Sequence, residues 1–170
     1  MNQVERARLC RAQLKRYGAL RQAVAAGEEA RLAAIEKAAY GQAAGAERVK
    51  ASALPKPTEQ GALMAYGVEQ SMEGARRWVV AIQDAWSELL SYSPERAEIL
   101  ERYFQLNEDG WDYGRVAQAQ AKVCEKYSIS QAGFYRRLNE AVETVVFHAA
   151  RHGCFAQQKA PEGPGPKGEL

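Results

Sequence analysis

The residues with the clearest chemical potential lie between Ser130 and Asn139. In a helix over this segment, a set of polar side chains falls on one side. Arginine, glutamine and asparagine can make paired hydrogen bonds with base edges in the major groove of DNA. The hydroxyl of Ser130 can cap the first turn of the helix, and we assign Arg137 to a phosphate or an acidic partner. The predicted DNA-binding residues are Ser130, Gln131, Ala132, Tyr135, Arg136, Arg137 and Asn139.

The opposite side of this helix is apolar. Its residues recur at helical spacing and form one stripe, so this side should be buried. Ile129 precedes the helix and is expected to fill the gap between it and the helix before. Cys124 is small enough to let those two helices approach closely. The stripe consists of Phe134, Leu138, Ala141, Val142 and Val145.

This arrangement resembles the helix-turn-helix of sigma-factor region four and related regulators. In that family an apolar, a small and an acidic residue precede the turn, and an apolar residue with Ser follows it. The family prefers Gly for the left-handed turn position that Ser128 occupies here. The resemblance implies that the helix starting at Ser130 reads promoter bases and phosphates. The matching residues are Val123, Cys124, Glu125, Ile129, Ser130, Phe134, Leu138, Ala141 and Val142.

The N-terminal segment is basic. Between Met1 and Arg21 the positive side chains are opposed by Glu5 alone, whereas charges between Pro94 and His152 nearly cancel. The predicted DNA-reading segment therefore lacks a strong positive field, and phosphate neutralisation dominates non-specific affinity. One interpretation of the basic run is a solvated face, and the other is an auxiliary phosphate-contacting surface. The candidate phosphate contacts are Arg6, Arg8, Arg11, Lys15 and Arg16.

Two long helices are expected in the first half of the chain. Residues 2–49 read as one helix weakened by glycines, and residues 51–61 contain two prolines and read as a linker. A helix over residues 62–92 carries apolar residues at alternating spacings of four and three, which is the pattern of a coiled-coil seam. The first helix, folding back, or another subunit could cover this seam. Its residues are Val68, Met72, Ala75, Val79, Ile82, Trp86 and Leu89.

Helix start signals recur in the second half. Ser93 is a predicted N-cap, with Pro94 in the first helical position and acidic residues after it. Residues 107–110 read as a turn, and Asp112 can cap the helix that leads to Tyr127. The tail is rich in Gly and Pro and is expected to be disordered. The predicted domains are a coiled-coil helical hairpin for oligomerisation over residues 1–92, a helix-turn-helix domain over residues 93–155 and a disordered tail over residues 156–170.

Composition supports an all-α protein. Apolar residues make up 46% of the chain, and no stretch alternates in the manner of a strand. Three widely spaced cysteines without a C-x-x-C pair, and a start unlike a secretory signal, favour the reduced cytoplasm. No apolar run reaches the ~20 residues that span a bilayer, so no membrane partner is expected.

The order of elements carries a second resemblance, to small phage and prophage late-gene regulators of the RinA and ArpU type. In those proteins a short Leu-x-x-Arg-Tyr helix precedes a Trp and the helix-turn-helix. The matching residues here are Leu100, Arg102, Tyr103 and Trp111. The resemblance implies a transcription regulator that binds double-stranded DNA in the cytoplasm of a bacterial host. Because the DNA-reading segment alone should bind weakly, a homo-oligomer formed through the coiled coil is expected, with host RNA polymerase as a further candidate partner.

Other chemistries find little support. His148, His152 and Cys154 offer three metal ligands without an evident fourth, so no metal site is predicted. Acidic pairs such as Glu98 with Glu101 read as solvated, and no nucleotide-binding or hydrolase motif occurs. We therefore expect neither an enzyme nor a cofactor. Two alternatives remain: a small-terminase-like subunit that recognises phage DNA for packaging, and a structural helical adaptor.

Overall fold

The computed structural model describes residues 1–40 and 59–156, and within these ranges every regular element is a helix. This confirms the all-α prediction. Most of the predicted linker over residues 51–61, and the predicted tail from residue 157, lie outside the described residues. The helices are α1 (Gln3–Lys15), α2 (Tyr17–Tyr40), α3 (Glu59–Tyr92), α4 (Pro94–Phe104), α5 (Tyr113–Tyr127) and α6 (Gln131–Arg151).

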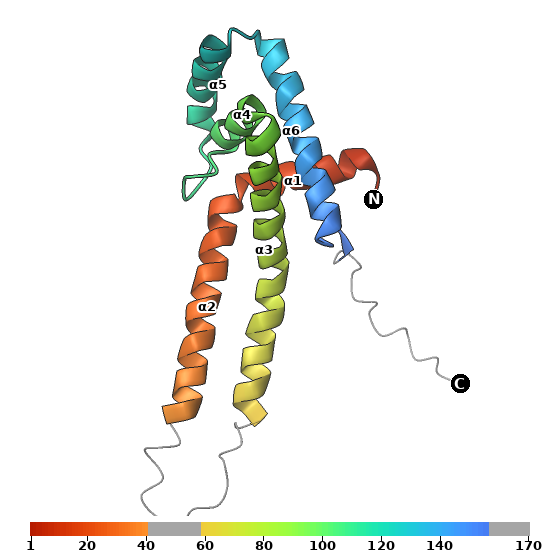
Figure 1. Cartoon of the computed structure of the whole chain (residues 1–170). Coiled ribbons are helices and arrows are strands. Elements are labelled where there is room, and N and C mark those ends of the chain that lie inside the picture. Colours follow the sequence, from red (N-terminus) through yellow and green to blue (C-terminus); the bar gives the residue numbers. More distant parts are fainter. Residues whose placement is uncertain (41–58, 157–170) are drawn as a thin grey trace, which may run out of the picture.

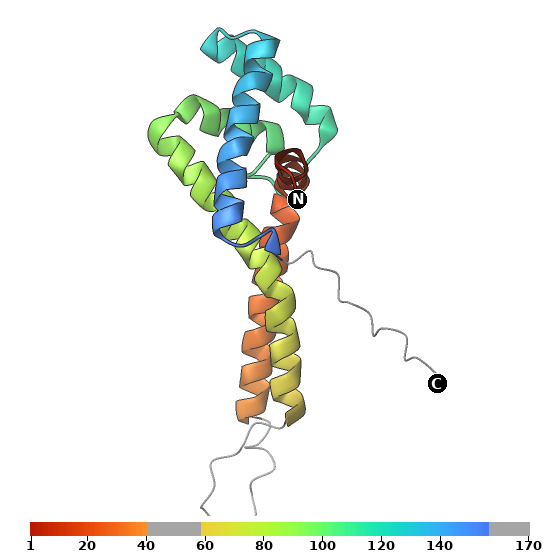
Figure 2. The same cartoon turned by 90° about the vertical axis from the view of Figure 1, so that its right-hand side faces the viewer.

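Helices α2 and α3 run side by side, and α4, α5 and α6 gather around the far end of α3 (Figure 1). The first helix, α1, turns sharply away from α2 and crosses α6 (Figures 1 and 2). The long α3 is therefore the element that connects the two parts. Its first half faces α2, and its second half packs on α4 and α6.

The predicted single helix over residues 2–49 is wrong at Arg16. The structure ends α1 there, because Arg16 leaves the helical conformation with φ −99° and ψ 7°. The cause is tertiary packing on the loop that follows α4: a Cβ atom on Gly18 would lie 2.3 Å from the backbone oxygen of Asp109. Glycine lets α2 start directly against that loop, while Tyr17 is buried beside it. Sequence periodicity alone does not report this contact.

The predicted seam of α3 is largely buried. Met72, Val79, Ile82 and Leu89 are buried, while Ala75 and Trp86 are partly buried against the core; the side chain of Val68 lies outside the described residues. Met72 occupies the place that a Cβ atom on Gly27 would take, so α2 and α3 approach closely there. An ion pair of 2.7 Å between Arg76 and Glu28 also joins the two helices. The chain itself thus covers the described part of the seam.

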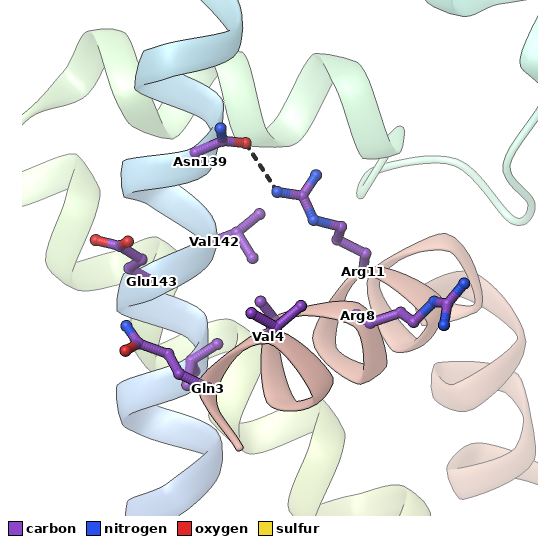
Figure 3. A pocket seen from close by; sticks show the side chains of 9 residues that line it. Gln3, Val4, Arg8, Arg11, Asn139, Val142 and Glu143 are labelled. Atoms are coloured by element: carbon purple, nitrogen blue, oxygen red, sulfur yellow. Dashed lines mark hydrogen bonds between the residues drawn. The ribbon is translucent and has the colours of Figure 1, made fainter. Parts of the chain in front are cut away.

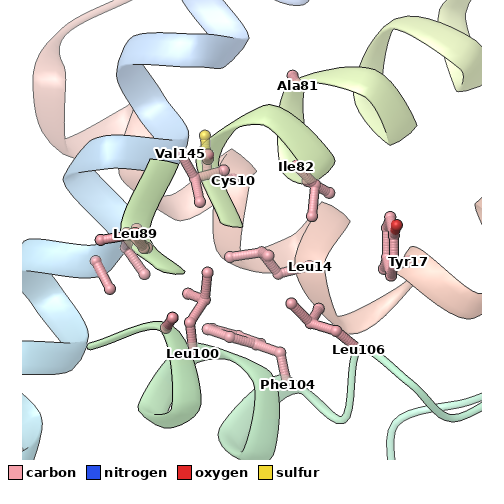
Figure 4. Packing of buried hydrophobic residues seen from close by; sticks show 14 of the residues in the cluster. Cys10, Leu14, Tyr17, Ala81, Ile82, Leu89, Leu100, Phe104, Leu106 and Val145 are labelled. Atoms are coloured by element: carbon pink, nitrogen blue, oxygen red, sulfur yellow. The ribbon is translucent and has the colours of Figure 1, made fainter. Parts of the chain in front are cut away.

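One hydrophobic core joins both predicted domains. Leu14 and Ile82 from the first predicted domain pack in the same cluster as Leu100, Phe104 and Phe134 from the second. Figure 4 shows several of these side chains meeting between α1, α3, α4 and α6. The division of the chain near residue 92 stays a prediction, but the two ranges share one packed interior.

Two predicted helix starts can be compared with the structure. Asp112 caps α5 as predicted, because its carboxylate accepts a hydrogen bond from the Gly114 amide at 2.9 Å. Ser93 occupies the N-cap position of α4, with Pro94 first in the helix, but its hydroxyl makes no capping hydrogen bond. Its backbone carbonyl instead accepts from the amides of Arg96 and Ala97. The predicted N-cap position of Ser93 is therefore confirmed, with the backbone carbonyl making the capping contacts.

Candidate nucleic-acid interface

A three-residue turn joins α5 to α6. Ser128 has a left-handed conformation, with φ 52° and ψ 42°, and its amide donates to the carbonyl oxygens of Cys124 and Glu125. Ile129 donates to the Cys124 carbonyl at 3.0 Å, which closes the end of α5. The Ser130 hydroxyl then accepts from the Gly133 amide at 3.1 Å, as its predicted capping role requires. These bonds fix the direction in which α6 leaves the turn.

Gly133 lies inside α6, where glycine weakens a helix, and the side chains around it explain why glycine occurs there. A Cβ atom there would lie 3.2 Å from a guanidinium nitrogen of Arg137 and 3.3 Å from the Ser130 hydroxyl. Its absence leaves room for Arg137 to reach Glu95 on α4, where the two side chains form an ion pair of 2.7 Å. Of the two predicted partners for Arg137, the structure provides the acidic one.

Helix α4 contacts the end of α5 through Glu98. Glu98 accepts hydrogen bonds from Lys126 at 2.5 Å, Tyr127 at 2.7 Å and Arg102 at 2.8 Å. Partial burial acts to raise the pKa of Glu98, but these three hydrogen bonds outweigh it and lower the pKa to about 2. Glu98 therefore ties the end of α5 to α4 as a charged group at neutral pH.

Six of the seven predicted DNA-contacting residues are exposed, and Arg137 is half-buried in its ion pair with Glu95. Every member of the apolar stripe of α6, from Phe134 to Val145, is buried. On the other side, Arg136 is exposed, and no ion pair of its guanidinium occurs within the described ranges. The remaining exposed members of the predicted set are Ser130, Gln131, Ala132, Tyr135 and Asn139.

The basic helix α1 contacts α6 beside these residues. Arg11 donates a hydrogen bond to the Asn139 side chain at 2.8 Å, and Figure 3 shows the two side chains meeting across the gap between the helices. Next to this bond lies an open groove of about 560 Å³ between α1 and α6. Apolar Val4 and Val142 line it together with Arg8 and other polar residues. The sequence predicted both components but not that they meet.

Aromatic side chains extend the same region. Lys15 lies 4.2 Å from the centre of the Trp111 ring, and Trp111 donates a hydrogen bond to the Tyr103 carbonyl at 2.9 Å. The Tyr103 and Tyr135 rings are 6.5 Å apart, and the Trp111 and Tyr113 rings are 5.9 Å apart. We call this set the basic-aromatic surface; it consists of Arg11, Lys15, Tyr103, Trp111, Tyr113, Tyr135 and Asn139.

The pKa of Tyr103 is shifted by burial and by other members of the basic-aromatic surface. Burial is the main cause that raises its pKa, and Tyr135 adds to the rise, while the charge of Arg11 acts in the opposite direction. Tyr113 is 79% exposed, so the surface presents an aromatic ring to solvent. The sequence did not predict that Trp111 and Tyr113 belong to this surface. Their position beside Lys15 could not be read from spacing, although an exposed aromatic next to a basic segment is a known signal for nucleic acid.

The other candidate phosphate contacts are dispersed. The Arg6 guanidinium lies 5.4 Å from the centre of the Phe155 ring, near the opposite end of α6. Arg8 lines the groove and is exposed, and Arg16 is exposed at the break between α1 and α2. Arg11 and Lys15 are therefore the two members of the predicted basic run that the fold brings to the basic-aromatic surface.

The comparisons with known proteins found no matching family model, no similar curated protein and no similar solved structure. Among the helices of the described ranges, none combines the length and the apolar character that crossing a membrane requires.

Proposed function

We propose that this protein is a sequence-specific regulator of transcription that binds double-stranded DNA, and that α6 is its recognition helix. The observation that carries the proposal is the contact between Arg11 and Asn139. It sets a basic helix beside the exposed polar side of α6. The left-handed turn at Ser128 and the cap at Ser130 further support a helix-turn-helix of the sigma region-four kind. The proposed phage or prophage origin rests on the resemblance in residues 99–142.

In the proposed complex, the first half of α6 enters the major groove, because recognition helices usually present their N-terminal residues to base edges. Gln131 can bond an adenine edge, and Arg136 a guanine edge or a phosphate. Arg11 and Lys15 lie toward the other end of this stretch, where they can contact the phosphates that border the groove. Tyr135 and Tyr113 offer apolar contact beside them.

Selection of bound fragments from a phage or host genome would provide a specific site, and mobility-shift assays on it test the proposal. Arg136→Ala should weaken specific binding by ~1–3 kcal/mol if the guanidinium pairs with a base, and it should keep the melting temperature because the side chain is exposed. Phe134→Ala should instead lose ~3–5 kcal/mol of folding stability, since the ring is 1% exposed.

The decisive variant is Gln131→Ala, Tyr135→Ala and Arg136→Ala combined. If this protein remains folded and binds the selected site at full strength, α6 is not the recognition helix. Arg151→Ala, an exposed change in the last turn of the same helix, is the matched control and should leave binding unchanged. Sedimentation of the same samples tests the first alternative, because a large ring points to a terminase-like subunit. Absence of DNA binding in the mobility-shift assays points to an adaptor.

A further inference from the structure

Two histidines and two carboxylates meet between the second half of α3 and the end of α6. His148 lies in the last turn of α6, and His152 directly follows that helix as its C-cap; Asp84 and Glu88 lie one turn apart on α3. Nε2 of His152 is 2.7 Å from a carboxylate oxygen of Asp84, and Nε2 of His148 contacts the Glu88 carboxylate. One ligand atom each from Asp84, His148 and His152 lie within 4.8 Å of one another.

This ligand set suits a transition-metal ion. Two histidines at positions i and i+4 of a helix present their rings on one face, as in zinc sites of the H-x-x-x-H kind. Imidazole and carboxylate ligands together bind Zn²⁺ at bond lengths of about 2.0–2.2 Å. Tetrahedral ligands at these lengths are roughly 3.3 Å apart, so the ligand atoms of Asp84, His148 and His152, which lie within 4.8 Å of one another, need only a short movement to reach that spacing.

His148 adds an independent indication. It is 5% exposed, and its Nδ1 atom has no hydrogen-bond partner in the part of the chain that the structure describes. Buried polar atoms without partners are rare and costly unless they serve a purpose. Asp84, Glu88 and His152 are more exposed than His148, so an ion can reach the cluster from solvent.

We propose that Asp84, His148 and His152 bind one divalent transition-metal ion, with Zn²⁺ as the first candidate, and that this ion fastens the end of α6 to α3. In the sequence, the two histidines and Cys154 show no evident fourth ligand. Cys154 is buried outside this cluster, whereas the carboxylate ligand, Asp84, comes from α3, more than sixty positions earlier. At 1.5 Å per residue, His148 lies roughly 25 Å along α6 from Gln131, so the ion supports the helix and does not touch DNA.

The test is calorimetric titration of the full chain, free of any affinity tag and stripped with a chelator, with ZnCl₂ at near-neutral pH. We expect one ion per chain and a higher melting temperature with Zn²⁺ than with the chelator. The chain has two histidines in all, so no other imidazole can account for binding. Loss of a group that only hydrogen-bonds a metal ligand costs about 10–100-fold in metal affinity, so loss of a direct ligand in His152→Gln or Asp84→Asn should cost at least ~100-fold.

Glu143→Gln is the matched control, because Glu143 is an exposed carboxylate of α6 that faces the α1 groove instead; it should bind Zn²⁺ as the parent does. Absorption of the Co²⁺ form, without a thiolate charge-transfer band, would exclude a cysteine ligand, Cys154 included. Equal affinity in His152→Gln and the parent, or no binding at micromolar Zn²⁺, would overturn the proposal. Metal-free protein that still binds its DNA site would separate this outcome from failure of the proposed function.

Discussion

Arg11 and Asn139 are 128 positions apart in the chain, and their side chains form a hydrogen bond of 2.8 Å. This bond joins the basic helix α1 to the exposed side of α6 and holds the Arg11 guanidinium there. Without it, Arg11 would be one charge on a solvated helix. With it, a guanidinium lies at the end of the predicted base-reading stretch, where a phosphate can replace or share its bond with Asn139.

Arg11→Ala is therefore expected to weaken binding to all DNA sequences by a similar factor. The slope of log affinity against log salt concentration should become shallower by about one phosphate contact, that is by ~0.9. Mobility-shift or fluorescence titrations at several salt concentrations measure this slope. Arg31→Ala, on the part of α2 remote from α6, should leave the slope unchanged. An unaltered slope in Arg11→Ala would leave the basic run as a solvated face.

Features that depend on neighbouring residues could be predicted from the sequence. The buried stripe of α6 follows from spacing alone, and the caps at Asp112 and Ser130 follow from side chains that bond amides two or three positions on. Features that depend on distant segments could not. The break at Arg16 arises from packing against the Asp109 loop, and no periodicity in α1 or α2 reports that loop.

The same distinction between neighbouring and distant residues applies to the candidate sites. The exposed residues of α6 were predicted, because one helix supplies them all. The contact of Lys15 with Trp111 and that of His152 with Asp84 each join two elements, and their residues are ordinary in isolation. A lysine or an aspartate on a helix surface usually lies in solvent without a specific contact. Only the packing of α1 and α3 against the rest of the fold brings these pairs together.

Ile82→Asp tests the burial of the α3 seam. Ile82 is 1% exposed within the core, so the substitution would bury a charge without a partner and should cost several kcal/mol of folding stability. Gln83→Asp places the same side chain one position away, where the residue is exposed, and should change stability by less than ~0.5 kcal/mol. Thermal melts by circular dichroism compare the two. Equal melting temperatures would contradict the packing of α3 described above.

Gly18→Ala tests the contact that ends α1. Alanine favours a helix over glycine by ~1 kcal/mol, but its methyl group would lie 2.3 Å from the Asp109 carbonyl oxygen, and that atom belongs to the backbone. We expect a net loss of ~1–3 kcal/mol through the forced shift of the loop. Gly110→Ala is the control, since no atom lies within 4 Å of a Cβ there. A stabilised Gly18→Ala protein in chemical denaturation would show that the loop moves freely.

The last prediction concerns the pH dependence of the Glu98 contacts. The pKa of Glu98 falls from 4.5 to about 2 in the folded protein, although partial burial opposes the fall, because Lys126, Tyr127 and Arg102 donate hydrogen bonds to its charged form. A carboxyl group whose pKa is lower in the folded state stabilises that state above its unfolded pKa. This contribution is lost as the pH falls from about 4.5 towards 2.

Glu98→Gln should accordingly lower the free energy of unfolding by about 1–2 kcal/mol near neutral pH, a value reduced from the full linkage because the partner side chains are half exposed. Urea denaturation over a pH series measures the difference from the parent, which should shrink below about pH 4.5 and vanish near pH 2. Glu125→Gln, which changes an exposed carboxylate near the end of α5, should show neither effect.

Faster amide exchange at Ser128 and Ile129 in Glu98→Gln would place the loss at the turn, since Glu98 holds the end of α5 against α4. A difference between Glu98→Gln and the parent that stays constant across the pH series would show that Glu98 contributes through packing instead of charge.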